Sequence, residues 1–355
     1  MGRRTKPRTW RAGLVRYRGA AVTIKKLLAL MGILSAVPAV AQIRTSEFLA
    51  DPPPTKSSHA STICDAKNGL LAAWFGGTAE RTPDCVIWLT RQEGGKWSAP
   101  VEVARGNEDG RQQYACWNPV LFEKKSGPLY LFYKVGPSPS QWWGRVMRSD
   151  DGGITWTKSR RLPDGIVGPV RNKPVELPSG TILCGASTED QGWRVHMEWT
   201  KNPFAQWDRT EPLNSSLNFG AIQPTILRWP GERTQILCRT KQQVIASSWC
   251  DTNVRQWGAM TRTVLPNPNS AIDAVMLKTG TALLVYNPST DSRGELSVAL
   301  STDGTEWRRV LDIDRGPGEY SYPAVIQDQS GMVHVTYTWR RERIKHVVID
   351  PSGLR

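Results

Sequence analysis

The amino-acid sequence predicts an all-β protein, a six-bladed β-propeller, and three observations lead to this prediction. Tryptophans follow short turns at intervals close to 50 residues, and a second motif recurs six times. The 355 residues also include 16 Trp, 31 Gly and 25 Pro, a composition typical of short strands joined by turns. A repeat of this length that holds several short strands is typical of propeller blades with four strands each.

The first repeat is a tryptophan that follows a turn rich in Asp, Gly and Thr. Its spacings are 59, 51, 50 and 50 residues, and its copies end at Trp97, Trp156, Trp207, Trp257 and Trp307. The turns 149–155 and 301–306 are the clearest copies. Short Asp side chains bond neighbouring backbone amides in such turns. We therefore interpret the turns as structural, with each Trp packed between sheets.

The second repeat is a polar residue, then Pro or a small residue, then an apolar run and a Gly turn. Its six copies begin at His59, Asn118, Lys173, Gln223, Asp273 and Tyr322. We assign it to the innermost strands, so these residues are expected around the central mouth. The last unit lacks a terminal Trp, and we expect Ile43–Leu49 to supply its outer strand and close the ring. A tandem of separate small β domains is the alternative.

The N-terminus resembles a secretory signal. Residues 1–42 contain nine Lys or Arg and no acidic residue, and an apolar run over Leu27–Ala41 ends in Ala39-Val40-Ala41. This pattern predicts a signal peptide over residues 1–41, cleaved after Ala41, and a propeller domain over 42–355 in the periplasm or outside the cell. The apolar run is short for a membrane span, which needs about 20 residues, although an uncleaved anchor is an alternative.

Charge and cysteine content exclude several function classes. The net charge of +14 falls to +5 without the N-terminal segment, which suits an anionic substrate or simple solubility. No Lys/Arg-rich helix or nucleic-acid motif is present, so we expect no nucleic-acid partner. None of the six Cys forms a C-x-x-C pair, and His196, His334 and His346 lack metal-type spacing. We therefore predict no metal and no cofactor, and buried free thiols at Cys184 and Cys238.

With its Ser-x-Asp-x-Gly-x-Thr-Trp turns on six units, the sequence resembles the sialidase (neuraminidase) superfamily from about His59 to Asp350. The resemblance implies an exo-glycosidase that acts on a terminal acidic sugar of a glycan, and the N-terminal pattern predicts that it is exported. In that superfamily a Tyr is the nucleophile, a Glu activates it, an Asp is the acid/base, and three Arg bind the substrate carboxylate.

The resemblance carries four residues onto this chain. Tyr320, in the Tyr-Ser pair that opens the last unit, matches the nucleophile, and Asp84, after the first hairpin, matches the acid/base. Arg239 and Arg293 match the second and third carboxylate-binding arginines. The structural alternatives are a core tyrosine, a turn aspartate and surface arginines.

Three departures accompany these matches. His59 stands in place of the first Arg, Gln223 in place of the activating Glu, and Thr338 in place of the Glu that steadies the first Arg. The loss of an Arg together with its partner indicates a remodelled pocket, in which sialic acid specificity is in doubt.

The chemistry of these residues sets requirements on the site. A phenol has a pKa of about 10, so Tyr320 needs a neighbouring base to act as a nucleophile. The neutral amide of Gln223 cannot be that base, and Glu319 or Asp273 are the candidates. Asp84 needs a raised pKa to act as an acid, and burial would supply it. His59 could donate to a carboxylate or act as a base, or be structural. Lys173 could supply the missing cation, and Tyr322 lies at the expected mouth.

Two other functions remain open from the sequence. A polysaccharide lyase would use a Tyr and a His to abstract the proton α to a uronate carboxyl group, and His59 and Gln223 favour it. A non-catalytic carbohydrate-binding propeller is favoured by the missing Glu and Arg. The retained Asp84 and Tyr320, with the two arginines, favour the hydrolase over it.

Overall fold

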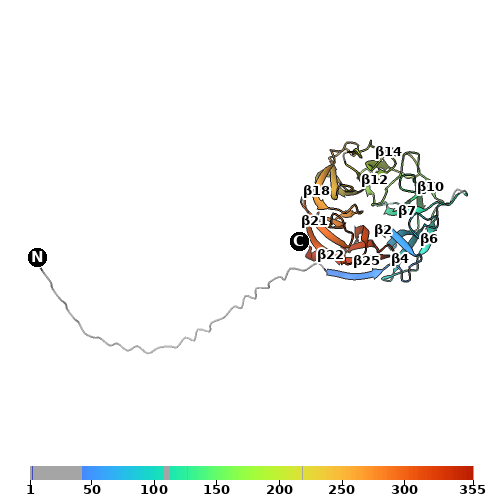
Figure 1. The fold of residues 1–355 in the computed structure, drawn as a ribbon, viewed down its shortest axis with the longest axis horizontal. Coiled ribbons are helices and arrows are strands. Elements are labelled where there is room, and N and C mark those ends of the chain that lie inside the picture. The colour runs from blue at the N-terminus through green and yellow to red at the C-terminus, as the bar shows by residue number, and fades with distance from the viewer. Residues whose placement is uncertain are drawn as a thin grey trace, which may run out of the picture. The chain divides into compact units, whose positions relative to one another are not determined.

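The protein folds as a six-bladed β-propeller, as predicted. The computed structural model describes Gly2 and residues 42–354, except positions 108, 109, 111, 126 and 218. Six antiparallel sheets follow one another along the chain and form a ring (Figure 1). The predicted export signal over residues 1–41 lies, apart from Gly2, outside the described residues. In the part described, no helix is long and apolar enough to cross a membrane.

Each blade is built from consecutive strands, with the first strand at the centre. Blade 1 contains β2 (Ser57–Ala66), β3 (Gly69–Gly77), β4 (Val86–Glu93), β5 (Lys96–Trp97) and β6 (Val101–Ala104). Blade 2 contains β7 (Cys116–Glu123), β8 (Leu129–Val135), β9 (Trp143–Ser149) and β10 (Arg160–Arg161). Blade 3 contains β11 (Val175–Glu176), β12 (Ile182–Thr188), β13 (Arg194–Thr200) and β14 (Asp208–Arg209).

The second half of the ring follows the same plan. Blade 4 contains β15 (Ala221–Arg228), β16 (Thr234–Thr240), β17 (Val244–Cys250) and β18 (Thr261–Pro266). Blade 5 contains β19 (Asp273–Met276), β20 (Ala282–Tyr286), β21 (Glu295–Ser301) and β22 (Arg308–Arg315). Blade 6 contains β23 (Tyr320–Gln327), β24 (Val333–Trp339), β25 (Arg343–Asp350) and β1 (Gln42–Phe48). Short 3₁₀ turns cover Pro230–Glu232 and Pro351–Gly353.

The N-terminal strand closes the ring, which confirms the expectation for Ile43–Leu49. β1 pairs antiparallel with β25, with Ile43 opposite Ile349 and Phe48 opposite Lys345. In Figure 1 the blue N-terminal strand lies along the red C-terminal blade. β1 is therefore the outermost strand of blade 6, and the edge of β25 is paired with a strand from the other end of the domain.

A chain of polar side chains fastens this closing strand. His334 Nδ1 lies 3.0 Å from His346 Nε2, His334 Nε2 lies 3.1 Å from Asp328, and His346 Nδ1 lies 3.2 Å from Glu47 on β1. Trp97 of blade 1 donates its Nε1 proton to Glu47 at 3.1 Å. The contacts thus join β24, β25 and β1 to the neighbouring blade, and we call this group the histidine clasp.

The repeated tryptophans pack between adjacent blades, as predicted. Trp156 packs in the apolar cluster of blades 1 and 2, Trp207 in that of blades 2 and 3, Trp257 in that of blades 3 and 4, and Trp307 in that of blades 4 and 5. The aspartates of the turns bond the expected amides. Asp151 accepts from the backbone N–H of Thr155 at 2.9 Å, and Asp303 from that of Thr305 at 2.8 Å.

Four of the innermost strands carry a β-bulge at the same place. The ladder skips two residues in β2, β7, β15 and β23, and the first skipped residues have positive φ: Ala60 (53°), Asn118 (39°), Gln223 (56°) and Tyr322 (52°). A bulge leaves backbone groups unpaired. Neighbouring blades satisfy them: Thr338 Oγ1 accepts from the N–H of Ala60 at 3.1 Å, and Asn172 donates to the carbonyl of Gln223 at 3.0 Å.

All six cysteines lie within the described residues and are free thiols, five of them buried. The expectation of buried free thiols at Cys184 and Cys238 is confirmed. Burial raises the pKa of the Cys184 thiol well above its ordinary value, and it raises that of Cys238 as well. These thiols act as small apolar groups in the core.

We predict that Trp207→Ala lowers the free energy of unfolding by about 3–5 kcal/mol, because it removes a buried indole from the packing between two blades. Val264→Ala, at a side chain that is 77% exposed on β18, should change it by less than about 0.5 kcal/mol. Urea unfolding of both variants measures the difference. Equal stability of the two variants would contradict the packing role of the repeated Trp.

A second prediction concerns the histidine clasp and pH. Burial lowers the pKa of His346 below its ordinary value of 6.5, and the charge of His334 acts in the same direction, whereas Glu47 opposes them. The unfolded chain therefore binds more protons below pH 6.5, so stability is full above that pH and is lost as pH falls. We expect a loss of about 1–3 kcal/mol between pH 6.5 and 4.5. In thermal unfolding, His346→Gln should flatten this part of the profile; an unchanged slope would contradict the assignment.

Candidate functional site

Tyr322 lies at the centre of a cluster of arginines from three other blades. Its hydroxyl accepts a hydrogen bond from Arg239 Nη1 at 2.8 Å. The Cζ atoms of Arg171, Arg239 and Arg293 lie 5.6, 5.6 and 5.9 Å from the centre of its ring. These arginines come from blades 3, 4 and 5. The cluster concentrates positive charge around one phenol, an arrangement suited to binding an anion.

Asn269 holds two of these arginines in place. Its backbone carbonyl accepts from Arg239 Nη2 at 2.5 Å and from Arg293 Nη2 at 2.7 Å, and its side-chain Oδ1 accepts from Arg239 Nε at 3.1 Å. Asn269 has a φ of 56°, a conformation that Asn tolerates better than most residues. The loop before β19 therefore fixes the spacing of Arg239 and Arg293, although Asn269 shows no sign of this role in the repeat pattern.

Glu319 and Ser321 support Arg293 from the other side. Glu319 accepts from Arg293 Nη1 at 2.9 Å, from Arg341 Nε at 2.8 Å and from Ser321 Oγ at 2.5 Å. Burial would raise the pKa of Glu319, but the hydrogen bonds from Arg341 and Ser321 and the charge of Arg293 outweigh it and lower the pKa to about 2. Arg341 also contacts Glu80. Glu319 is thus an ionised anchor for arginines.

Arg171 is the arginine that the sequence pattern does not reveal. The backbone N–H groups of Leu177 and Asp328 each donate to the carbonyl four residues further on, so these two residues mark the same turn in blades 3 and 6. Arg171 lies six residues before Leu177, and Tyr322 lies six residues before Asp328. Arg171 therefore occupies the position in blade 3 that corresponds to the bulge residues Gln223 and Tyr322 of blades 4 and 6. Its Nη2 donates to the carbonyl of Pro323 at 2.6 Å, and within the described residues its Nε has no partner. Burial lowers the pKa of this guanidinium to about 10, and a buried cation of this kind favours an anion nearby.

Lys173 and Asp273 lie two residues beyond the bulge position and bind each other. Lys173 Nζ contacts Asp273 Oδ2 at 2.8 Å. Asp273 also accepts from Thr225 Oγ1 at 2.8 Å and from the N–H of Val325 at 2.8 Å. The pair therefore joins blades 3, 4, 5 and 6. Lys173 is directed to this pair rather than to Tyr322.

The two tyrosines of the last blade have different surroundings. Tyr320 is buried in the apolar cluster that contains Leu296 and Tyr337, and its hydroxyl donates to the carbonyl of Pro317 at 3.3 Å. Tyr322, two residues further, bears the contacts with the arginines. In the described residues, no hydrogen bond joins Glu319 or Asp273 to a tyrosine hydroxyl.

His59 packs against Tyr322 and is fully buried. The centres of the two rings are 4.1 Å apart, and Phe75 lies edge-on at 5.5 Å. Burial lowers the pKa of His59 well below 6.5, and the charge of Arg341 acts in the same direction. Neither ring nitrogen has a partner among the described residues. The imidazole is therefore neutral, and the bulge residue of blade 1 is Ala60 rather than His59.

Gln223 completes the contacts of Arg239. Its Oε1 accepts from Arg239 Nη1 at 3.3 Å, the same nitrogen that donates to Tyr322. An amide oxygen in this place orients the guanidinium but cannot take a proton from the phenol. The fold thus brings Gln223 and Tyr322, two residues of the second repeat, into contact with Arg239, which the resemblance indicated.

Asp84 does not have the buried environment expected for an acid. It is exposed, and its Oδ2 accepts from the N–H and Oγ1 of Thr78 at 2.9 and 2.6 Å. Thr82 donates to its Oδ1. The hydrogen bonds from Thr78 and then Thr82 lower the pKa of Asp84. These contacts tie the Asp84 carboxylate into the loop that follows β3.

Glu189, at the end of β12, is a carboxyl group with the opposite character. Burial raises the pKa of Glu189. The charge of Arg239, the hydrogen bond from Trp193 and the charges of Lys241 and Arg81 act in the opposite direction but do not outweigh burial. Trp193 Nε1 donates to Glu189 Oε2 at 3.0 Å, and the Trp193 ring lies 5.3 Å from Arg239 Cζ. Glu189 therefore borders the arginine cluster. It lies outside both repeats, so no sequence signal indicated it.

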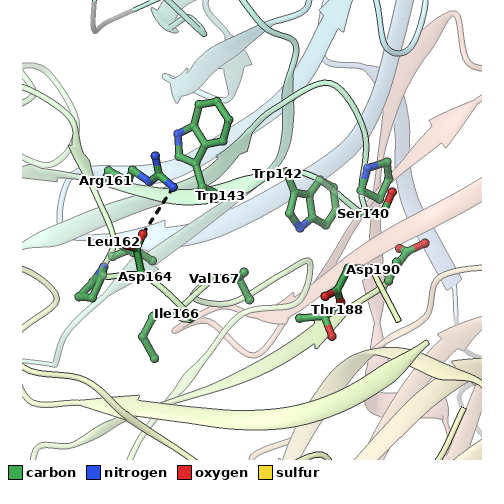
Figure 2. Close-up of a pocket in the computed structure, with 14 residues that line it drawn as sticks. Ser140, Trp142, Trp143, Arg161, Leu162, Asp164, Ile166, Val167, Thr188 and Asp190 are labelled. Carbon is green, nitrogen blue, oxygen red and sulfur yellow. Dashed lines mark ion pairs between the residues drawn. The ribbon is translucent and has the colours of Figure 1, made fainter. Parts of the chain in front are cut away.

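A pocket of about 210 Å³ opens beside Glu189, between loops of blades 2 and 3. Figure 2 shows Trp142 on one side of this pocket and Thr188 and Asp190 across from it. Glu189 also lines it. At another part of the wall, Arg161 pairs with Asp164 at 3.5 Å and stacks over Trp143. Among the described residues, no group of three or more His, Cys, Asp or Glu is placed to bind a metal ion.

The sequence matches one known protein family over most of the propeller. The family model for a BNR repeat-like domain matches residues 68–335. No curated protein matches the sequence at a significant level.

Solved structures show the same fold at low sequence identity. A protein of unknown function from Dyadobacter fermentans aligns with a TM-score of 0.73 and 15% identity over 88% of this chain and 99% of its own. The Hadza microbial sialidase Hz136 aligns with a TM-score of 0.71 and 16% identity, over 86% of this chain and 68% of its own. The intramolecular trans-sialidase from Ruminococcus gnavus aligns with a TM-score of 0.68 and 11% identity, over 87% of this chain and 97% of its own. The chain therefore belongs to the family of proteins with a BNR repeat-like domain and has the six-bladed propeller fold found in sialidases.

Proposed function

We propose that the protein is an exported glycoside hydrolase that removes a terminal acidic sugar, a sialic acid or a related ulosonic or uronic acid, from a glycan. The observation that carries this proposal is the convergence of Arg171, Arg239 and Arg293 around Tyr322. Guanidinium groups bind carboxylates through paired, charge-assisted hydrogen bonds. The basic, apolar N-terminal segment supports export, and the fold of sialidases supports a glycan substrate.

The arginines have different parts in this proposal. Arg239 and the partly exposed Arg293 bind the carboxylate directly. Arg171 is buried behind Tyr322 and contributes positive charge rather than a contact. Asn269 and Glu319 hold Arg239 and Arg293 in position. Arg239 already donates to Asn269, Gln223 and Tyr322, so a carboxylate that binds it takes the place of one of these partners.

We also propose that Tyr322 rather than Tyr320 faces the reacting carbon of the sugar. Tyr322 is the tyrosine in contact with Arg239, whereas Tyr320 is packed in the core. The sequence resemblance favours Tyr320, because Tyr320 is followed by Ser321 as in the Tyr-Ser motif, whereas Tyr322 is followed by Pro323. Their hydroxyl groups can be removed one at a time to decide between them.

A lyase remains the second candidate, because His59 supports it. A neutral imidazole with both nitrogens unpartnered among the described residues packs on Tyr322. In a lyase these two side chains would remove the proton α to a uronate carboxyl group, while arginines neutralise the carboxylate. The product would be unsaturated and absorb in the ultraviolet, whereas a hydrolase releases a saturated sugar.

We predict that Arg239→Gln lowers kcat/KM for aryl glycosides of the acidic sugar by about 30-fold or more. Removal of one partner of a buried charge pair costs about 2–5 kcal/mol. The panel contains sialic acid, a shorter 3-deoxy-2-ulosonic acid and glucuronic acid. Arg262→Gln, an exposed arginine on β18 of the same blade, is the matched control and should retain activity. Unchanged kcat/KM in Arg239→Gln would contradict carboxylate binding at this cluster.

The tyrosines give a further prediction. Tyr322→Phe should reduce kcat by about 100-fold or more, as expected for loss of a group that acts on the reacting atoms. Tyr320→Phe should stay within about threefold, because its hydroxyl bonds only the carbonyl of Pro317 in the loop before β23. Steady-state kinetics on the best aryl glycoside measures both, and the reverse order would return the role to Tyr320. Binding without turnover, or an ultraviolet-absorbing product from a uronate polymer, would replace the hydrolase by a binding protein or a lyase.

A further inference from the structure

We propose that Glu189 is the general acid of the reaction and that the pocket beside it binds the sugar on the leaving side of the cleaved bond. This inference rests on the proposed hydrolase function. It concerns a carboxyl group and a pocket between blades 2 and 3, and Arg81, from the loop that carries Asp84, also faces this carboxyl group.

Glu189 lies where the arginine cluster meets the pocket. On one side, its Oε2 accepts from Trp193, whose ring packs against Arg239 Cζ at 5.3 Å and Lys241 Nζ at 4.8 Å. On the other side, Glu189 is part of the pocket wall. Glu189 therefore lies between the arginine that would bind the carboxylate and the pocket that would hold the next sugar.

The lining of the pocket suits a neutral sugar ring. Trp142 offers an indole face for the apolar side of a pyranose, and Thr188 and Asp190 offer hydrogen-bond partners for hydroxyl groups across the pocket (Figure 2). Arg161 is paired with Asp164, so the charged groups at that part of the wall already balance each other. At about 210 Å³ the pocket is smaller than the roughly 300–1,000 Å³ of sites for drug-sized ligands, which fits a single ring.

The environment of Glu189 also fits an acid. A general acid must hold its proton at the working pH, and burial raises the pKa of this carboxyl group even though Arg239, Lys241 and Arg81 face it. The other carboxyl groups considered differ. Asp84 is exposed with a lowered pKa, and Glu319 is ionised between two arginines.

The proposed step balances as follows. Glu189 gives its proton to the glycosidic oxygen as the bond from that oxygen to the sugar carbon breaks, and the electron pair of this bond stays on the oxygen. The second sugar leaves as an alcohol. A water molecule then adds to the sugar carbon and returns a proton to the Glu189 carboxylate, so the acid is restored.

Dependence on the leaving group provides the test. A 4-nitrophenolate leaves without protonation, whereas a sugar alcohol requires it. We predict that Glu189→Gln lowers kcat by about 100-fold or more on a disaccharide of the acidic sugar and a neutral hexose. On the 4-nitrophenyl glycoside of the same sugar, the loss should stay within about fivefold. The alkaline limb of the disaccharide kcat/KM profile should also disappear, and the exposed Glu211→Gln is the control.

The pocket is tested separately by Trp142→Ala and by the more conservative Trp142→Phe, because Trp142 also packs near Trp117. Trp142→Ala should raise KM for the disaccharide about 10-fold, with KM for the methyl glycoside unchanged, and Trp142→Phe should restore most of the binding. Unfolding temperatures establish that each variant is folded. Equal KM changes for both substrates would overturn the assignment of the pocket.

Failure of this inference differs from failure of the proposed function. If the wild-type protein hydrolyses none of the acidic glycosides, the hydrolase proposal itself fails. If the wild type is active and Glu189→Gln loses the same factor on the disaccharide and the 4-nitrophenyl glycoside, the hydrolase stands and Glu189 is not its acid.

Discussion

The bulge in the innermost strands is the constraint on which the site depends. Gln223 and Tyr322 adopt positive φ there, a conformation that costs free energy for residues other than glycine and persists only where surrounding contacts enforce it. The backbone groups that the bulge releases are bound by neighbouring blades: Asn172 donates to the carbonyl of Gln223, and Arg171 to that of Pro323. The contacts that stabilise the bulge therefore also bring charged side chains to the mouth.

Ring closure is the second requirement, because the site combines residues from most of the blades. Tyr322 of blade 6 meets Arg171, Arg239 and Arg293 only if blades 3, 4, 5 and 6 hold their places in one ring. The pairing of β1 with β25 and the histidine clasp secure that ring at its joint. At the mouth, burial lowers the pKa of His59, and Arg341, anchored by Glu319, brings a positive charge close to this ring.

The sequence predicted the architecture well and the site in part, for a physical reason. Repeats report which faces are buried, so six blades, the packed tryptophans and the closing strand could all be read from spacing. A bulge changes which side chain faces the mouth, and no spacing reports it. In blade 6 the bulge gives Tyr322 the polar contacts that were expected of Tyr320. In blade 3 the cation expected at Lys173 lies two residues earlier, at Arg171, outside the short paired strand β11. Glu189 and Asn269 lie in segments without repeat, where position follows from tertiary contacts alone.

The central claim is that the arginines around Tyr322 recognise a carboxylate, and equilibrium binding tests it without assuming any catalysis. Calorimetry should compare sialic acid, a 3-deoxy-2-ulosonic acid and glucuronic acid, as methyl glycosides, with the methyl esters of the same sugars. The account predicts that at least one acid binds about 30-fold or more tightly than its ester, because esterification removes the charge that the arginines pair with. Equal affinity of acid and ester for every sugar that binds would contradict it.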